Sequence, residues 1–411
     1  MHAVILNDYA VANGGSSVVA LASARGLAKR GIEVTLFTAV RSDDISQMEE
    51  TDGLHLVNLG QEEIVKDPNR LRAFRNGIAN KSAAMELRNI LTNCDPANTV
   101  VHVHTYTKAL SPLALDVPLR MGFKTILSLH DFFISCPTGS FFVHRDAAIC
   151  ERRPLSLNCF TCSCDRRSYP QKLWRSARTF YQNQMLGIDR RLSLYLGISQ
   201  LSMRVLQPWL PPNVPVRLLR NPVDFAYAEP APVATNSPFI FIGRFSREKG
   251  PLLFAEAVKR SGVPAVFIGD GELRAEAERL CPDAIFTGWL PAEEVKKWLR
   301  RARALVFPPL WYETLGLVVL EAAANGIPAI ISDRCAATDF ITHNENGLHF
   351  QHGSVEALCA QIQELQDPLQ VKKLGQQAHA WYWNDPWTLE RHVSELVDIY
   401  ESLLSKNTVP L

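Results

Sequence analysis

The sequence predicts an α/β protein built from two doubly wound, parallel-sheet domains. Short apolar, β-branched runs alternate with helical patterns along the chain, which is typical of βαβ units whose sheets are buried on both faces. The length of 411 residues suits two or three domains. A proline-rich stretch at residues 207–215 divides the apolar runs into two series, and we expect it to act as a semi-rigid hinge.

Eleven apolar runs are expected to form strands. Six precede the proline-rich stretch, at residues 3–7, 33–38, 54–59, 99–104, 124–130 and 194–199. Five follow it, at residues 239–243, 265–269, 284–287, 304–307 and 329–332. We therefore expect a first domain over residues 1–207 and a second over residues 213–385. Residues 386–404 have the pattern of one amphipathic helix added after the second domain.

Composition excludes several classes of protein. Hydrophobic residues make up 47% and charged residues 21% of the chain, which argues against disorder. No apolar run reaches the roughly 18 residues that a membrane span needs, and the N-terminus lacks a signal peptide's layout. We therefore expect a cytoplasmic protein.

The net charge of +1 hides an asymmetry between the two halves. Residues 1–220 carry 26 Lys/Arg against 18 Asp/Glu, whereas residues 221–411 carry 17 against 24. A basic half indicates an anionic partner or surface, and the alternative is an unselected surface fluctuation.

The segment at residues 311–333 is the most informative one in the second half. Glu321 is its only charged residue between positions 314 and 332, and burying an unpaired carboxylate is costly, so Glu321 must reach polar partners or a ligand. Glu313 lies just before the expected helix, about two turns from Glu321. Both carboxylates could accept hydrogen bonds from sugar hydroxyls. The alternative is a charge favoured by the helix dipole plus a structural buried glutamate.

A second motif, at residues 239–250, runs from an apolar strand into Gly243 and Arg244, and Lys249 precedes a helix. A guanidinium and an ammonium at a strand end suit a diphosphate. Amides of the helix that begins near Leu315 would add dipole stabilisation without a metal. The alternative is a basic surface loop.

Two features of the first half also follow strands. Gly14 and Gly15 precede a helical pattern and would let the backbone approach a ligand closely. The dinucleotide fingerprint G-x-G-x-x-G is absent there, which counts against an NAD-dependent dehydrogenase. His130 ends another strand, where we expect it to face the crevice between the domains, although a lone histidine at a strand end is more often structural than catalytic.

Together these residues resemble the retaining glycosyltransferases of family 4, which have the GT-B fold. The most specific parts are Glu313-x7-Glu321, the run GRFSREKG at residues 243–250, the box at residues 221–224 that ends in Asp224, and the turn at residues 344–348. The resemblance implies two Rossmann-like domains facing across a cleft. It also implies that residues 386–411 return as a helix to the first domain.

The resemblance assigns the donor diphosphate to Arg244 and Lys249, with the backbone amides of Leu315, Gly316 and Leu317 presented to the diphosphate or the sugar. No catalytic metal is expected.

It assigns the ribose hydroxyls to Glu321 and the hydroxyls of the transferred sugar to Glu313. Gly14 and Gly15 would form a loop over the donor, and His130 corresponds to the family's active-site histidine near the transferred sugar.

The implied activity is transfer of a hexose from a UDP- or GDP-sugar to a glycan or lipid-linked glycan, in bacterial surface polysaccharide or lipopolysaccharide assembly. Residues 335–339 depart from the family pattern, with Asp339 where many relatives have a glutamate, which leaves the sugar open. Two alternatives remain: another GT-B enzyme, such as an epimerase or a phosphorylase, and a non-catalytic zinc and membrane scaffold.

A cysteine-rich insertion is expected at about residues 136–164. Its C-x-x-C pair and two upstream thiols could form a tetrahedral structural zinc site from Cys136, Cys150, Cys159 and Cys162. The alternative is a set of unligated thiols.

The stretch from residue 120 to 220 is rich in lysine and arginine, and residues 166–181 mix these cations with aromatic side chains. This composition suits an anionic membrane surface or a lipid-diphosphate acceptor, so we expect a peripheral position at the inner face of the plasma membrane. No nucleic-acid-binding motif accompanies it. The alternative is an ordinary solvated face.

Overall fold

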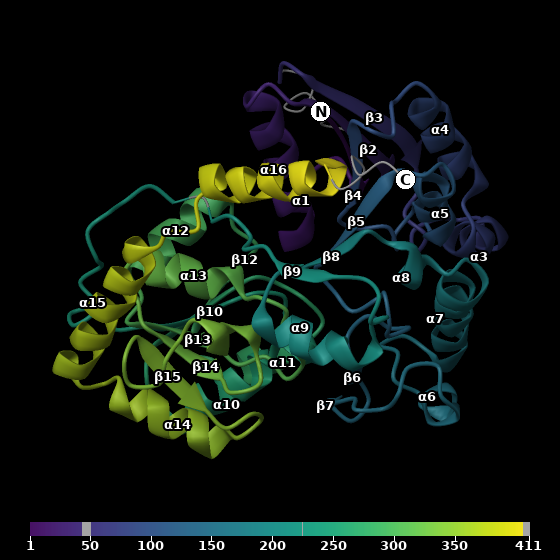
Figure 1. The fold of residues 1–411 in the computed structure, drawn as a ribbon. Coiled ribbons are helices and arrows are strands. Elements are labelled where there is room, and N and C mark those ends of the chain that lie inside the picture. Colours follow the sequence, from purple (N-terminus) through teal and green to yellow (C-terminus); the bar gives the residue numbers. More distant parts are fainter. Residues whose placement is uncertain (43–50, 224, 406–411) are drawn as a thin grey trace. The chain divides into compact units, whose positions relative to one another are not determined.

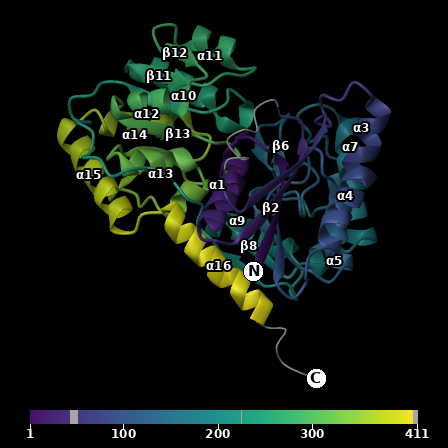
Figure 2. The ribbon, with the colours of Figure 1, turned by 90° about the horizontal axis from the view of Figure 1, so that it is seen from above.

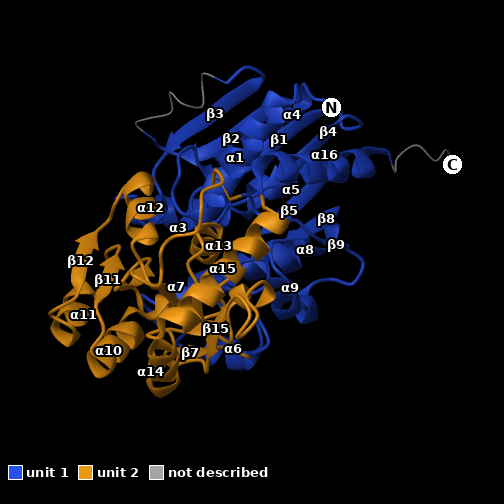
Figure 3. Cartoon of the chain, turned by 90° about the vertical axis from the view of Figure 1, so that its left-hand side faces the viewer, with its two compact units in different colours: residues 1–140, 152–222, 388–411 blue, residues 141–151, 223–387 orange. Residues whose placement is uncertain are grey.

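The computed structural model describes residues 1–42, 51–223 and 225–405 (Figure 1). Asp224, part of one family motif, therefore lies outside the described residues. The chain separates into two compact units, which Figure 3 shows in different colours. Unit 1 comprises residues 1–140, 152–222 and the end of the chain from residue 388, and unit 2 comprises residues 141–151 and 223–387. Within the described ranges, no helix combines the length and apolar character needed to cross a bilayer.

Unit 1 contains a seven-stranded parallel sheet in the order β3-β2-β1-β4-β5-β8-β9. Its strands are β1 (His2–Tyr9), β2 (Glu33–Val40), β3 (Leu54–Gln61), β4 (Thr99–Val103), β5 (Lys124–Leu129), β8 (Leu194–Gly197) and β9 (Val216–Leu218). The register sets Val4 beside Thr35 on β2 and beside Val101 on β4. All six predicted strands of the first half are confirmed, and the edge strand β9 is one that the apolar pattern did not predict.

The helices of unit 1 begin largely where a serine or asparagine side chain can accept a hydrogen bond from the first turn. Asn69, Asn80, Ser168 and Ser199 each do so. The helices are α1 (Gly15–Lys29), α3 (Arg70–Ile78), α4 (Lys81–Thr92), α5 (Pro112–Arg120), α6 (Leu157–Thr161), α7 (Tyr169–Phe180), the π-helical turn η1 (Tyr181–Met185), α8 (Ile188–Arg191), α9 (Gln200–Leu206) and the 3₁₀ turn η2 (Gln207–Trp209).

The last helix, α16 (Leu389–Ser405), returns to unit 1 and packs on α1, as expected (Figures 1 and 2). Its apolar face joins the core of the unit. Val393 packs directly against Gly26, where a Cβ would overlap Val393 Cγ2. Two buried hydrogen bonds fix its register: His392 Nε2 lies 2.8 Å from Ser23 Oγ, and the Tyr400 hydroxyl lies 2.7 Å from His102 Nδ1.

Unit 2 contains a six-stranded parallel sheet in the order β12-β11-β10-β13-β14-β15. Its strands are β10 (Phe239–Ile242), β11 (Ala265–Ile268), β12 (Ile285–Gly288), β13 (Ala304–Phe307), β14 (Ala329–Ser332) and β15 (Gly347–Phe350). Five of the six were predicted, and β15 was not.

The helices of unit 2 flank this sheet. They are η3 (Arg247–Lys249), α10 (Pro251–Ser261), α11 (Arg274–Leu280), α12 (Ala292–Arg300), α13 (Leu317–Ala324), η4 (Ala336–Asp339), α14 (Val355–Glu364) and α15 (Pro368–Asn384). Buried phenylalanines fill the core between β10, β11 and α10; the rings of Phe254 and Phe267, for example, lie 4.8 Å apart.

A short antiparallel hairpin, β6 (Phe142–Val143) with β7 (Ala148–Ile149), lies within the range that we expected to be a first-domain insertion. It belongs to unit 2 instead, whereas the flanking residues up to 140 and from 152 belong to unit 1.

Candidate active site

The loop after β10 carries the two cations predicted to hold a diphosphate. The chain leaves the strand at Ile242, passes Gly243 and Arg244, and forms the turn η3, which ends at Lys249. Gly250 then starts α10 in the left-handed region, with φ of 70°. A Cβ at this position would overlap the carbonyl oxygen of Pro308, so only glycine lets the loop lie against the segment after β13.

This close approach brings Lys249 to Glu313. The Lys249 ammonium lies 2.5 Å from Glu313 Oε2, and the same oxygen accepts a hydrogen bond from Trp311 Nε1 at 3.0 Å. Lys249 Nζ also lies 5.2 Å from the centre of the Trp311 ring. Glu313 Oε1 makes no hydrogen bond to any described residue. The ammonium keeps further N–H groups for a ligand, because it has three donors.

Glu248, next to Lys249, is a buried carboxylate that sequence reasoning missed. Burial alone would raise its pKa, but hydrogen bonds from the Ser246 hydroxyl at 2.7 Å and from the backbone lower the pKa, as do the nearby His144 and Arg244. Its carbonyl accepts a hydrogen bond from the Leu310 amide at 2.9 Å, which ties the two loops together. Arg244 itself is exposed, and no contact joins it to Glu313 in the described residues.

The hairpin β6–β7 packs on the same loop. Arg247 Nη1 donates to the carbonyls of His144 and Arg145, at 3.2 and 2.9 Å. The His144 Nδ1 atom lies 3.9 Å from Glu248 Oε2. The hairpin therefore supports the loop that carries Lys249.

The segment after β13 ends in the helix α13, whose first turn supplies the predicted backbone amides. Gly316 takes the N-cap position in the left-handed region, with φ of 83°. Leu317 is the first helical residue, and Leu315 is buried just before it. The first amides of a helix lack partners within it, so those at Gly316 and Leu317 are suited to bind an anion. The segment that departs from the family pattern touches this loop, because the Ala336 amide donates to the Glu313 carbonyl at 3.0 Å.

Glu321 lies in the second turn of α13, and Glu313 lies in the loop before the helix, as predicted. Burial raises the pKa of Glu321, and Lys296 only partly offsets this effect. In the described part of the chain, no donor hydrogen-bonds the Glu321 carboxylate. Burying a carboxylate without a hydrogen-bond donor costs free energy, and a ligand with hydroxyl groups would supply the donors.

Gly14 and Gly15 belong to unit 1, at the start of α1. Gly14 is the N-cap, and both glycines are exposed. The space in front of Gly14 is open, since a Cβ there would meet no atom within 4 Å.

His130 also belongs to unit 1, directly after β5. Its Nε2 atom lies 2.9 Å from His104 Nδ1, and the two rings stack with centres 5.1 Å apart. Burial, helped by the nearby His392, lowers the pKa of His130 to about 3, so the imidazole is neutral at pH 7. Burial raises the pKa of the neighbouring Asp131 to about 6. The His104 Nε2 atom is buried and has no hydrogen-bond partner in the described residues.

The predicted zinc site is not supported by the geometry. Among the described residues, which include all four proposed ligands, no group of three or more histidine, cysteine, aspartate or glutamate side chains could hold a metal ion. The thiols of Cys136 and Cys164 instead lie within electrostatic range of Arg175. Spacing along the chain could not show whether the fold gathers Cys136, Cys150, Cys159 and Cys162 around one point.

The basic and aromatic segment forms α7, but several of its cations point inward. Lys172 is fully buried and donates to the carbonyls of Cys159 and Phe160. Arg178 is 4% exposed. Arg175 forms an ion pair with Asp165 at 3.1 Å. These three cations are therefore not free to face a membrane.

Trp311 and Glu248 are the site residues that sequence reasoning missed. Trp311 opens the informative segment, and its place two residues before Glu313 is the signal that could have found it. Glu248 looks like any charged residue of a basic loop, and only the packing shows that it is buried.

Comparison with protein families is consistent with this geometry. A model described as Glycosyltransferase Family 4 matches residues 13–227, more than half of the chain, and one described as Glycosyl transferases group 1 matches residues 229–381.

Among individual proteins, the O-antigen chain mannosyltransferase C of Escherichia coli is 27% identical over 177 residues, which are 41% of this chain and 48% of that protein. The chain thus spans about half the length of this curated relative.

Solved structures resemble the whole chain. Sucrose-phosphate synthase from Thermosynechococcus elongatus superposes with a TM-score of 0.74 at 17% identity, covering 98% of this chain and 99% of that one. Anabaena HepE in complex with UDP and glucose superposes with a TM-score of 0.68 at 14% identity, covering 98% and 100%. At such low identity the likeness shows the fold alone.

Proposed function

Because this chain belongs to glycosyltransferase family 4, we propose that it transfers a hexose from a UDP- or GDP-sugar to a glycan or lipid-linked glycan, with retention of the anomeric configuration. One observation carries the proposal: the Lys249 ammonium and the Glu313 carboxylate meet at 2.5 Å beside the start of α13. A cation, a carboxylate and helix amides in one place suit the diphosphate and the sugar of one donor molecule.

The chemical step follows from charge. As the bond between the sugar and the diphosphate breaks, negative charge grows on the leaving phosphate. Lys249, Arg244 and the amides of Gly316 and Leu317 stabilise this charge through groups that are already oriented. The acceptor hydroxyl oxygen then forms the new glycosidic bond with the oxocarbenium-like sugar on the face that the diphosphate leaves, and its proton passes to the leaving phosphate oxygen. No protein nucleophile is assigned.

The two glutamates act on hydroxyl groups. Glu321 accepts the hydroxyls of the nucleotide ribose, which compensates for its burial. Glu313 uses Oε2 for Lys249 and Trp311 and keeps Oε1 for a hydroxyl of the transferred sugar. The ion pair also fixes the carboxylate before the donor arrives.

In unit 1, Gly14 and Gly15 are proposed to contact the donor through their backbone, and the open space at Gly14 supports this role. His130 is proposed to act on the transferred sugar. Since burial keeps its pKa near 3, it acts as a neutral hydrogen-bonding group and not as a cation.

The biological context follows from the relatives. The similarity to an O-antigen mannosyltransferase supports a role in bacterial surface polysaccharide or lipopolysaccharide assembly. The similarity to a UDP-bound structure supports a nucleotide-sugar donor. We place the enzyme at the inner face of the plasma membrane, where exposed apolar side chains such as Leu71 and Phe74 could meet the bilayer surface. Binding to liposomes with and without anionic lipid tests this location.

The first experiment is a thermal-shift screen against UDP, GDP, ADP and their sugars, followed by donor turnover measured as release of the nucleoside diphosphate. Arg244→Ala and Lys249→Ala should each lower turnover by about 100-fold or more, since each removes a group that stabilises the leaving diphosphate. Arg279→Ala and Lys259→Ala, exposed in the same unit, are the matched controls. Near-normal turnover of both site variants would refute the assignment.

Product analysis separates the alternatives. NMR of the product should show a new glycosidic bond with the donor's anomeric configuration. A free epimerised sugar nucleotide without an acceptor would instead identify an epimerase, and absence of nucleotide binding would identify a non-catalytic scaffold.

A further inference from the structure

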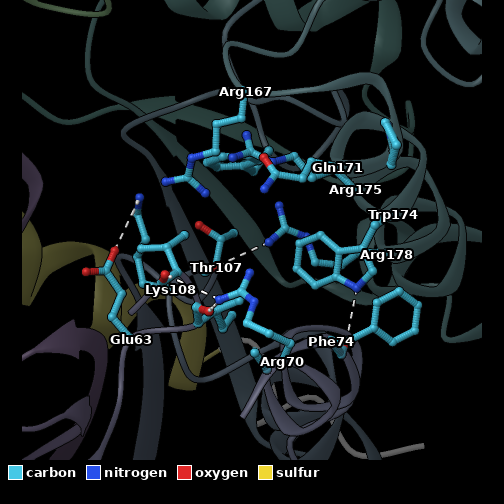
Figure 4. A pocket seen from close by; sticks show the side chains of 15 residues that line it. Glu63, Arg70, Phe74, Thr107, Lys108, Arg167, Gln171, Trp174, Arg175 and Arg178 are labelled. Atoms are coloured by element: carbon cyan, nitrogen blue, oxygen red, sulfur yellow. Dashed lines mark hydrogen bonds and ion pairs between the residues drawn. The ribbon is translucent and has the colours of Figure 1, made fainter. Parts of the chain in front are cut away.

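Unit 1 contains a cavity of about 310 Å³ that the donor site does not use. It lies where ligands of parallel α/β sheets bind, outside the carboxyl ends of strands. Residues 63–65 follow β3, Thr107 and Lys108 follow β4, and Phe133 follows β5. Helices α3 and α7 complete the wall (Figure 4).

The cavity is strongly basic. Five of its lining side chains are cationic and only Glu63 is acidic; the cations are Arg70, Lys108, Arg167, Arg175 and Arg178. Two of these charges are partly compensated, because Asp165 pairs with Arg175 at 3.1 Å and Glu63 lies 3.9 Å from Lys108. The lining therefore keeps an excess of positive charge.

Arg178 is the strongest indication of a ligand. Its guanidinium is almost fully buried, and Figure 4 shows it among the side chains that surround the cavity. It lies 5.0 Å from the centre of the Phe133 ring and 5.4 Å from that of Trp174. One N–H donates to the Thr107 carbonyl at 3.1 Å. Across the described residues no carboxylate forms an ion pair with it, and burial, with the nearby Arg175, lowers its pKa to about 10. Asp131 and Asp8 are near enough to raise its pKa but form no ion pair with it. A buried cation with no carboxylate in contact is costly unless an anion binds.

The rest of the wall suits an anion attached to an apolar or sugar group. Trp174, held by a hydrogen bond from Nε1 to the Phe74 carbonyl at 3.1 Å, offers an aromatic face. Phe74 and its neighbour Leu71 remain 57% and 84% exposed beside Arg70. Gln171 adds an amide. Aromatic faces bind sugars or prenyl chains, whereas guanidinium groups bind phosphate oxygens in pairs.

We propose that this pocket binds the phosphate or diphosphate group of the acceptor substrate, with Arg178 at its base and Arg70 and Arg167 at its mouth. The proposal rests on the proposed function, because it identifies the acceptor of that transfer as a phosphate ester. The phosphate can be carried by a lipid or by a free sugar, and both sources present the same oxygens to these cations.

Three small-molecule probes separate these sources: farnesyl diphosphate, α-glucose 1-phosphate and farnesol, which lacks the phosphate. Calorimetry should show that the full-length protein binds at least one phosphate ester and binds farnesol at least about 10-fold more weakly. Preference for farnesyl diphosphate indicates a lipid-linked acceptor, and preference for glucose 1-phosphate indicates a phosphorylated sugar; either result supports the pocket.

The variants locate the binding. The double variant Arg70→Ala/Arg167→Ala changes two exposed side chains and should lower the affinity for the preferred probe at least about 10-fold. The control variant Arg75→Ala/Arg88→Ala changes two side chains that are also exposed on unit 1 but lie outside the cavity, and it should change this affinity less than about 2-fold. Arg178→Gln should weaken binding further, and the mouth variant keeps the test valid if Arg178→Gln does not fold.

Lys249→Ala distinguishes the two sites. It should weaken nucleotide-sugar binding and leave the acceptor probe unchanged, whereas the mouth variant should do the reverse. The pocket is refuted if the wild type binds no phosphate ester, if the mouth variant binds as well as the wild type, or if Lys249→Ala removes probe binding. Failure of the wild type to bind any nucleotide sugar would instead refute the proposed function.

Discussion

Replacing Glu321 by glutamine tests whether this carboxylate serves a ligand or the fold. Burial raises its pKa, and no donor in the described residues hydrogen-bonds it. Glutamine keeps the shape of the side chain and removes the charge. If Glu321 only stabilised the fold, its replacement would destabilise the protein. If it serves the ribose, the replacement should spare stability and weaken nucleotide binding.

The magnitude follows from the lost charge. A hydrogen bond to a charged group contributes about 1.5–3 kcal/mol net, so Glu321→Gln should weaken binding of the preferred nucleoside diphosphate about 10- to 150-fold. The free energy of unfolding should stay the same or rise, because the neutral amide is less costly to bury than the unpaired carboxylate.

Calorimetry with UDP and GDP and urea unfolding at pH 7.5 measure both quantities. Glu294→Gln, exposed on α12, is the matched control. A 2′,3′-dideoxynucleotide should bind the wild type and Glu321→Gln almost equally, since it lacks the hydroxyls in question. Unchanged nucleotide affinity together with a clear loss of stability would refute the reasoning.

Three further predictions follow from the same structure. Glu313→Gln, which weakens the contact with Lys249 and with the sugar, should lower kcat about 10- to 100-fold while donor Kd changes less than about 3-fold; steady-state kinetics with unchanged kcat would contradict it. Tyr400→Phe leaves the buried Nδ1 atom of His102 without its hydrogen-bond partner, while Nε2 keeps Ser128. It should lower the free energy of unfolding, measured in urea, by about 1–3 kcal/mol and leave turnover per folded molecule unchanged. Equal stability would count against the role of this hydrogen bond. Burial lowers the pKa of His102 and of His130 to about 3, so their stabilising contribution is complete above the unfolded value of about 6.5 and is lost as pH falls towards 3. Each of these two histidines should lower the free energy of unfolding by about 1.4 kcal/mol at pH 5.5. Burial raises the pKa of Asp131 to about 6, so its protonation over the same range should raise the free energy of unfolding by about 0.8 kcal/mol. Burial also lowers the pKa of His104, well below its ordinary value, and this acts in the same direction as for the other two histidines. The free energy of unfolding measured in urea should therefore be clearly lower at pH 5.5 than at pH 7.5, and a protein that is equally stable at both pH values would contradict the assignment.

Much of the fold could be predicted because parallel strands buried on both faces are continuous apolar runs. Strands such as β11 and β13 are apolar and buried along their whole length, and no polar residue pattern competes with that signal. The amphipathic pattern of α16 was equally clear, but its place on α1 depends on contacts such as the one between His392 and Ser23, which are far apart in the sequence.

The missed strands lack that signal. β9 has three residues, only partly buried, and follows the proline-rich stretch. β15 contains His349 and begins at a turn, so it reads as a loop. The strands of the hairpin β6–β7 are two residues long, shorter than any window in which periodicity can be recognised.

The charged residues of the donor site could be predicted, but the residues that hold them in place could not. Lys249 and Glu313 each followed a strand end, so their meeting could be expected from the topology. Glu248 could not be identified, because its burial results from the Leu310 amide and from the hairpin residue His144, both far away in the chain.

The basic stretch of the first half shows what a count of charges cannot reveal. The cations and aromatic residues over 166–181 suited either an anionic membrane surface or a lipid-diphosphate acceptor, with an ordinary solvated face as the alternative. In the fold, Lys172 and Arg178 are buried, and their donors meet backbone carbonyls of α6 and of the segment after β4. Hydrogen bonds to backbone carbonyls cannot be recognised from the spacing of residue types in the sequence, because every residue carries a carbonyl group.

The two anion sites therefore differ in how they are prepared for their ligands. In unit 2, the charge of Lys249 is already neutralised by Glu313, so a ligand joins an existing ion pair. In unit 1, Arg178 contacts aromatic faces and a carbonyl, and Asp131 and Asp8 act on it without forming an ion pair, so a bound anion would be the first counter-charge in contact with it. Lys249, in the acidic half of the chain, is thus paired with a carboxylate, whereas Arg178, in the basic half, forms no ion pair within the described residues. A phosphate that enters the pocket of unit 1 relieves a burial cost, which is the physical reason to expect that the acceptor, and not only the donor, carries phosphate.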